Sequence, residues 1–262
     1  MSSLNNHEPV IDYKTLYDTN QLNMWLDIST YCNAACPQCH RTNPRTLGKV
    51  DWLPLVQWTF DQFVTCFPVH TMQHITKFEF CGTWGDPVMN KDLLQMCEYI
   101  IKNSNSLIQI NTNGSIRDEA WWWDLGVLCG KRLLVIVDID GSTQEIHEMY
   151  RQKTDLQKII ANMRALMGTQ ADLAVFTVVF KHNQDDLLNI SKLAKSFGAL
   201  RQVFVVSNRF NKKNIFKYYN GPDLITLDMA TIHNDDNHVL KQSILKHWSK
   251  GTQFFTINLE GV

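Results

Sequence analysis

Three closely spaced cysteines are the residues in this sequence most able to do chemistry. Cys32, Cys36 and Cys39 all lie in the short segment Tyr31–Arg41. Thiolates at this spacing can hold three irons of a cubane cluster and leave the fourth iron without a protein ligand, which keeps it reactive. A structural zinc site is the alternative, but its only nearby fourth ligand, His40, adjoins Cys39 and is poorly placed to share the metal. The spacing therefore favours an iron-sulfur cluster over zinc.

Three further segments rich in glycine, asparagine and acidic residues follow apolar runs later in the chain. They are Gly82-Thr83-Trp84-Gly85-Asp86-Pro87, Asn111-Thr112-Asn113-Gly114 and Asp138-Ile139-Asp140-Gly141. Acids at the end of an apolar strand are costly unless they are bonded, so we expect Asp138 and Asp140 to bond a hydroxyl group or a backbone amide. Glycines at 82 and 85 allow a backbone to approach a ligand closely.

Alternating strand and helix patterns predict the elements that position these segments. The expected strands are Met24–Ser29, Ile75–Phe80, Leu107–Ile110, Leu133–Ile139, Leu173–Phe180 and Val203–Val206. The expected helices begin at Asp51 and near Asn90, include Trp121–Trp123 and Ile159–Leu166, and end with Asp186–Phe197 before Gly198. Six units are too few for a closed eight-unit barrel. The sequence therefore predicts an α/β fold, either a partial (β/α)6 TIM-like barrel or a doubly wound sheet.

The pattern changes after about residue 208, which suggests three parts of the chain. We expect a lead segment at 1–21, a barrel core at 22–207 and a short C-terminal tail or cap at 208–262. In the tail, Asn211–Lys217 is expected to be a solvated loop and His233–His238 is hydrophilic. The tail is expected to cap one end of the barrel.

Composition narrows the classes of function. The formal charge is -1 at pH 7, so no excess of basic residues can neutralise a phosphate backbone, and nucleic acid is disfavoured as a partner. No apolar run approaches the length of a membrane span, and the N-terminus lacks the apolar core of a signal peptide. The number of cysteines, seven, is odd, and three of them lie within eight residues while the rest are single. This pattern is typical of metal ligation in a reducing compartment, so we expect a soluble, cytoplasmic protein. Cys66, Cys97, Cys129 and Cys81 are expected to pack in the core.

The cysteine motif and the three later segments, in this order at four successive strand ends, resemble the radical S-adenosylmethionine (radical SAM) enzymes. The resemblance covers about residues 22 to 206. The last segment, with His147 and Arg151 beyond it, is similar to the branch of peptide-modifying (SPASM/twitch-like) and molybdopterin-biosynthesis enzymes. Many members of that branch hold auxiliary clusters with cysteines in a C-terminal extension. Because no cysteine follows Cys129 here, one cluster is expected.

The resemblance implies an enzyme whose [4Fe-4S] cluster, held by Cys32, Cys36 and Cys39 as metal ligands and catalytic residues, binds S-adenosyl-L-methionine (SAM) at its open iron. Reductive cleavage of SAM would give a 5'-deoxyadenosyl radical that abstracts hydrogen from an unidentified peptide, protein or small metabolite. An electron donor such as flavodoxin or ferredoxin is implied as a partner. The residues expected to bind SAM are Gln38, Gly82, Trp84, Gly85, Asp86, Pro87, Asn111, Asn113 and Asp138.

Several of these roles have alternatives. Gln38 stands where the family commonly has an aromatic residue near the adenine, and Asp138 stands where it often has serine. Asp86 could cap the following turn instead of contacting SAM. His147 and Arg151 could face a substrate, although the sequence slightly favours solvated side chains for both. A non-catalytic protein with a structural zinc or iron-sulfur site is the alternative function.

Overall fold

A parallel sheet is the central feature of the computed structural model, which describes residues 22–231 and 255–258. Seven strands join in the order β1-β2-β3-β4-β5-β6-β9, and every neighbouring pair is parallel. Their bounds are β1 Leu22–Leu26, β2 Ile75–Phe80, β3 Leu107–Thr112, β4 Leu133–Asp138, β5 Asp172–Val179, β6 Arg201–Val206 and β9 Phe255–Asn258. Within the described ranges this sheet does not close, which confirms the predicted partial TIM-like barrel.

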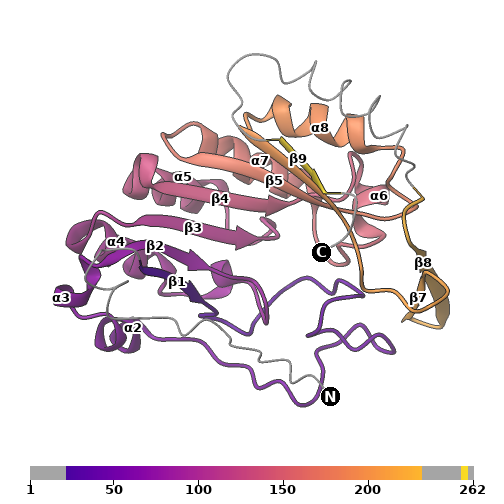
Figure 1. Ribbon diagram of the computed structural model, residues 1–262, viewed down its shortest axis with the longest axis horizontal. Helices are drawn as coiled ribbons and strands as arrows, with labels where there is room; N and C mark the ends of the chain where they lie inside the picture. Colours follow the sequence, from indigo (N-terminus) through magenta and orange to yellow (C-terminus); the bar gives the residue numbers. More distant parts are fainter. Residues whose placement is uncertain (1–21, 232–254, 259–262) are drawn as a thin grey trace, which may run out of the picture.

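Helices connect the strands and cover the outer face of the sheet (Figure 1). Their bounds are α2 Phe60–Cys66, α3 Val69–Met72, α4 Leu93–Asn103, α5 Glu119–Cys129, α6 Gln144–Glu148, α7 Leu156–Met167 and α8 Leu187–Ser196, with the short 3-10 helices η1 Pro87–Met89 and η2 Gly130–Arg132. In the part of the chain described, no helix combines the length and apolar character needed to cross a membrane.

Alternation along the strands separates a core face from an inner face. On β4, Leu133, Val135 and Val137 are buried and belong to the main hydrophobic core, whereas the residues between them are only half-buried. Side chains of a strand point alternately to opposite faces, so the half-buried set faces the inside of the open barrel. The inner face therefore has room for ligands.

Capping residues account for where several helices begin. Asp155 accepts a hydrogen bond from the Lys158 backbone N–H at the start of α7, and Asp118 does the same for Trp121 at the start of α5. Helix α8 ends before Gly198, as the sequence predicts, and that glycine has a φ of +94°. A left-handed backbone angle of this kind favours glycine because it has no Cβ.

The helix predicted from Asp51 begins nine residues later, at Phe60. Thr59 and Gln62 form a capping box at this point, with the Thr59 hydroxyl accepting from the Gln62 backbone N–H. Pro54 breaks the apolar spacing that the prediction relied on, and Trp52 is 63% exposed. The error arose because a three- to four-residue apolar spacing continues across a loop.

Most other boundaries differ from the predicted ones by a few residues. Strands β3 and β6 extend two residues further than expected at their C- and N-terminal ends, and α4 begins at Leu93, after η1. The core positions predicted for Cys97 and Cys129 are confirmed. The prediction is wrong for Cys66, which is exposed in the last turn of α2, and Cys81 is half-buried at the end of β2.

The described part of the predicted tail contributes a hairpin and a strand. Strand β7 (Ile215–Asn220) pairs with β8 (Asp223–Asp228) in an antiparallel hairpin, so the solvated loop expected at Asn211–Lys217 is a strand in its second half. The hairpin lies at the same end of the molecule as the carboxyl ends of the sheet strands (Figure 1). Strand β9 pairs with β6 at the edge of the sheet. The predicted lead segment 1–21 and the stretch His233–His238 lie outside the described residues.

Candidate active site

A cavity of about 630 Å³ lies at the carboxyl ends of the strands. Cys32, Cys36 and Cys39 line it together, as the sequence predicts. The other predicted residues on its wall are Gly82, Gly85, Asp86, Asn111, Asn113 and Asp138. Loops at this end of a parallel sheet carry the functional groups of barrel enzymes, so the position of the cavity suits an active site.

The cysteine loop, residues 31–42, is tied to the loops that follow β2 and β3. The Asp86 backbone N–H donates to the Tyr31 carbonyl at 2.7 Å. The Asn113 side chain donates to Oδ1 of Asn33 at 2.9 Å. These bonds join segments about fifty to eighty residues apart in sequence, so the positions of the thiols depend on the whole end of the sheet.

The same loop is tied to the segments after β4 and β6. The Ala35 backbone N–H donates to the Gln152 carbonyl at 3.0 Å. The Ser207 hydroxyl donates to Gln38 Oε1 at 2.6 Å, and Gln38 Nε2 donates to the Arg209 carbonyl at 2.8 Å. Arg209 Nη1 in turn donates to the Gln38 carbonyl at 3.0 Å. Gln38 thus acts as a tether between the cysteine loop and the end of the sixth strand.

The Asp86 carboxylate is buried and satisfied entirely by uncharged donors. It accepts from the Val88 backbone N–H at 3.0 Å, which caps η1, so the capping alternative is seen in the structure. It also accepts from the Thr112 hydroxyl at 3.0 Å and from the Asn113 backbone and side-chain amides at 2.9 and 2.7 Å. Burial raises the pKa of Asp86 to about 6, although the bonds from Asn113, Val88 and Thr112 oppose the shift.

Gly85 is required by the protein's own backbone. A Cβ on this residue would lie 2.2 Å from the Ser29 carbonyl oxygen and 2.7 Å from that of Tyr31. At Gly82 the nearest atom would be 3.2 Å away, a much milder contact. The sequence predicts that the backbone at this glycine approaches a ligand closely. In the structure, the group that Gly85 approaches is the backbone that leads into the cysteine loop.

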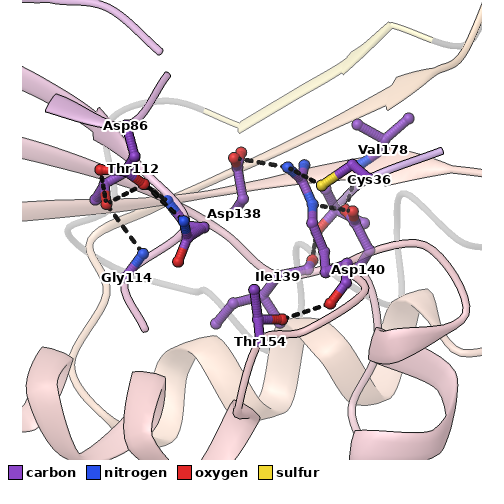
Figure 2. Close-up of polar contacts among 12 residues, drawn as sticks. Cys36, Asp86, Thr112, Gly114, Asp138, Ile139, Asp140, Thr154 and Val178 are labelled. Atoms are coloured by element: carbon purple, nitrogen blue, oxygen red, sulfur yellow. Dashed lines mark hydrogen bonds and ion pairs between the residues drawn. The ribbon is translucent and has the colours of Figure 1, made fainter. Parts of the chain in front are cut away.

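Arg151 forms a second charged centre with Asp138 and Asp140, which are labelled near Cys36 in Figure 2. Its Nη1 lies 2.9 Å from Asp138 Oδ2, and its Nε pairs with Asp140 Oδ2. The other Asp140 oxygen accepts from the Val178 backbone N–H at 2.7 Å, which confirms the expected bond to a backbone amide. Burial raises the pKa of Asp138 to about 7, and the Arg151 charge opposes that shift. Nη1 of Arg151 also lies 3.9 Å from Cys36 Sγ.

His147 and Arg151 are buried, so the solvated positions slightly favoured by the sequence are wrong. His147 Nδ1 accepts from the Asp140 backbone N–H at 3.2 Å, which assigns the proton to Nε2, 3.0 Å from Thr154 Oγ1. The Thr154 hydroxyl donates to the Arg151 carbonyl at 2.6 Å. Burial, with the Arg151 charge, lowers the pKa of His147 to about 3, so its ring is neutral and holds the Arg151 backbone in place.

The donor set fits an iron-sulfur cluster. Burial raises the pKa of Cys32 well above its ordinary value and that of Cys36 to about 12, so these thiols ionise only beside a strong positive charge such as iron supplies. Asn113 Nδ2 lies 3.8 Å from Cys32 Sγ and is a second donor facing the sulfurs, in addition to Arg151. Among the described residues, no three His, Cys, Asp or Glu side chains converge on one metal ion. A cubane binds each thiolate to a different iron and needs no such convergence.

Three residues predicted to bind SAM are not on the cavity wall. Gln38 bonds Ser207 and Arg209, as described above. The Trp84 ring packs against Trp52, with centroids 5.3 Å apart. Pro87 is buried as the first residue of η1. Their SAM contacts stay predictions, and these side chains are seen to stabilise the loops around the cavity.

Sequence reasoning missed several residues of the site. Thr112 and Asn33 adjoin motif residues, and their polar side chains inside the motifs were the available signal. Ser207 and Arg209 gave no signal, because they are 169 and 171 residues from Gln38 and only folding brings them to it. Asp140 was expected to be bonded, but nothing in the sequence paired it with Arg151.

Comparison with known proteins gives structural likeness without detectable sequence likeness. No protein-family model and no curated protein sequence matches the chain. Streptococcus suis SuiB bound to S-adenosylmethionine has a TM-score of 0.61 at 12% identity, over 92% of this chain and 50% of SuiB. The structure of anSMEcpe with bound AdoMet has a TM-score of 0.55 at 19% identity, over 70% of this chain and 50% of that one. A single-residue variant of spore photoproduct lyase has a TM-score of 0.58 at 12% identity, over 97% and 88%.

These structures are radical SAM enzymes, and the chain has their fold. It spans about half the length of SuiB and anSMEcpe. The shared fold agrees with the partial barrel predicted from the sequence.

Proposed function

We propose that this protein is a radical SAM enzyme that binds a [4Fe-4S] cluster at Cys32, Cys36 and Cys39 and SAM beside it in the cavity. The observation that carries the proposal is that three thiols from one loop line the same cavity as the glycine- and asparagine-containing ends of β2 and β3. When bound, the cluster supplies the electron that cleaves SAM to a 5'-deoxyadenosyl radical, which abstracts hydrogen from the substrate. SAM bound to SuiB and to anSMEcpe supports the same ligand here.

The residues around the thiols have distinct roles in this proposal. Asn113 and Arg151 place N–H donors 3.8 and 3.9 Å from sulfurs, and such donors raise the reduction potential of a cluster. Asp86 holds Asn113 in place through two hydrogen bonds. Asp138 has a side chain that is 27% exposed toward the cavity and can accept hydrogen bonds from SAM.

The Gly82–Gly85 backbone and Asn111 complete the proposed SAM site on the wall of the cavity. The proposal also includes a low-potential electron donor such as flavodoxin or ferredoxin and a reducing, cytoplasmic compartment, in agreement with the free thiols of all seven cysteines. SuiB and anSMEcpe have been solved with peptides bound. Since this chain covers only about half of each of those proteins, the substrate is argued below from this chain's own residues.

The test is anaerobic reconstitution with iron and sulfide, followed by reduction with dithionite in the presence of SAM and chromatographic assay for 5'-deoxyadenosine. The wild type is compared with Cys36→Ala. Cys66→Ala is the matched control, because it removes an exposed thiol from α2, outside the cavity. Iron content, sulfide content and the visible absorbance of the cluster are measured on all three proteins.

We expect 5'-deoxyadenosine from the wild type and from Cys66→Ala, and none from Cys36→Ala together with a loss of cluster absorbance. Stoichiometric zinc, no cluster absorbance and no 5'-deoxyadenosine in the wild type would overturn the proposal in favour of a structural metal site. A cluster that forms equally well in Cys36→Ala would overturn the ligand assignment.

A further inference from the structure

A group of residues on β1, β2 and β3 has no role in binding the cluster. Of this group, only Asn111 also belongs to the proposed SAM site. Trp25 on β1, Glu79 on β2 and Gln109 on β3 occupy neighbouring register positions and line the cavity. Lys77 contacts Glu79, and Asn111 follows Gln109 on the same face of β3. We call Trp25, Lys77, Glu79, Gln109 and Asn111 the polar wall.

Four side chains of the polar wall form one hydrogen-bonded ladder. Lys77 Nζ donates to Glu79 Oε2 at 2.7 Å and to Gln109 Oε1 at 3.4 Å. Asn111 Nδ2 donates to Glu79 Oε1 at 3.2 Å, and Gln109 Nε2 donates to Asn111 Oδ1 at 3.1 Å. These bonds fix the side-chain orientations. They leave one N–H on each amide and further lone pairs on Glu79 for a ligand.

Trp25 gives the wall an open apolar surface. Its side chain is 73% exposed, although Met24 and Leu26 on the other face of β1 pack in or against the core. An indole keeps its flat face available for stacking when no neighbouring side chain covers it. Trp25 therefore lies ready to stack on a planar group beside the Glu79 carboxylate.

Charge and size decide which planar group fits. Lys77 and Glu79 carry opposite charges in direct contact, so the ladder is formally neutral and favours neither an anion nor a cation. Strands β4, β5 and β6 contribute the apolar side chains of Ile136, Phe176 and Val205 to the rest of the wall. A cavity of about 630 Å³ has the size of a small-molecule site, and SAM must share it. A compact, uncharged ring with donors and acceptors along one edge suits the neutral ladder, the apolar side chains and the limited volume of the cavity.

We propose that the polar wall is the substrate site, and that the substrate carries a neutral planar heterocycle of the nucleobase or pterin type. The ring stacks on Trp25, and its edge is bonded by Glu79 and Gln109. Asn111, which belongs to the proposed SAM site, orients both side chains through the ladder. Carboxylate and amide side chains read the edges of bases in this way, and aromatic side chains stack on base faces. The inference rests on the proposed function only in placing this site beside SAM.

The test measures binding, not turnover. The full chain with its cluster is titrated without reductant, with SAM at saturation so that a nucleoside cannot be bound in place of SAM. The probes are adenosine, guanosine, cytidine, uridine and biopterin, and glycyl-leucine is the peptide comparison. Dissociation constants are measured by calorimetry for the wild type, Trp25→Leu and Glu79→Gln. Trp123→Leu, which removes a 47% exposed indole from α5, is the matched control.

We expect at least one of the five heterocycles to bind, more tightly than the dipeptide. Trp25→Leu should weaken that binding about tenfold or more, since stacking on an aromatic side chain commonly contributes that much, and Trp123→Leu should not change it. Glu79→Gln should also weaken it, while thermal unfolding shows that the variants remain folded. Binding of no heterocycle, tighter binding of the dipeptide, or no effect of Trp25→Leu would overturn the proposal. A protein that binds a heterocycle but gives no 5'-deoxyadenosine would overturn the proposed function alone.

Discussion

Two buried acidic centres flank the cysteine loop, and the protein compensates their charge in different ways. Asp86, after β2, is bonded only by uncharged donors from Val88, Thr112 and Asn113. Asp138 and Asp140, at the end of β4, share the guanidinium of Arg151. Both arrangements satisfy the oxygens, but only the second supplies an opposite charge.

The comparison shows that an ion pair does not by itself give a buried carboxyl group a lower pKa than hydrogen bonds from uncharged donors do. Burial raises the pKa of Asp86 to about 6, and burial raises that of Asp138 to about 7 despite the contact with Arg151. Two carboxylates share one guanidinium, so the charge of Asp140 opposes the ionisation of Asp138. The Asp86 centre therefore relies on uncharged hydrogen-bond donors and the Arg151 centre on its cation, which makes the two separable by mutation.

The largest expected effect is at the Arg151 centre. Arg151→Leu leaves Asp138 and Asp140 without their opposite charge, and removing one partner of a buried ion pair costs about 3 to 5 kcal/mol. We expect urea unfolding at pH 7 to show a loss of that size. Arg201→Leu is the control, since it breaks a partly exposed pair with Asp172 and should cost about 1 kcal/mol or less. Equal losses in the two variants would contradict the comparison.

The next effect is a dependence on pH at the Asp86 centre. The pKa of Asp86 rises from 3.8 to about 6 on folding, so the native state binds more protons than the unfolded state between these values. Its contribution to the free energy of unfolding is therefore lost as pH rises through this range, by roughly 3 kcal/mol in all. Asp86→Asn removes this contribution.

The measurement is urea unfolding of the wild type and Asp86→Asn at several pH values between about 4 and 7. The wild type should lose stability relative to the variant as pH rises. His147 has a lowered pKa and so has the opposite trend, but it is present in both proteins and cancels in the difference. A difference that does not change with pH would show that Asp86 is not protonated more readily in the native state.

The smallest effect is at a single donor of the Asp86 centre. Thr112→Val removes a buried hydroxyl that bonds both Asp86 oxygens, which should cost about 1 kcal/mol and raise the pKa of Asp86 above 6. Carboxyl NMR titration measures the pKa, and urea unfolding measures the cost. Thr65→Val is the control, because the Thr65 hydroxyl bonds an exposed backbone carbonyl on α2. An unchanged pKa in Thr112→Val would contradict the role of uncharged donors.

The sequence predicted the core strands well, and the helix boundaries less well. The strands of the core have apolar runs bounded by polar motifs, so they were recognisable without a structure. The helix expected at Asp51 begins at Phe60, because apolar spacing does not reveal that Trp52 is exposed in a loop. Likewise Cys66 looked like a core residue, but it is the last residue of a helix whose buried side is formed by Phe63.

The sequence by itself determined that three thiols follow the first strand and that polar segments follow the next three, because local patterns and short spacings depend on neighbours in the chain. Only the tertiary structure decided which distant side chains contact the cysteine loop and these polar segments. Arg151 is 115 residues from Cys36, and Gln38 is 169 residues from Ser207, yet each pair is in contact. Burial then sets the charge states of Asp86 and Asp138, since the cost of an ion depends on the surrounding protein and not on its sequence neighbours.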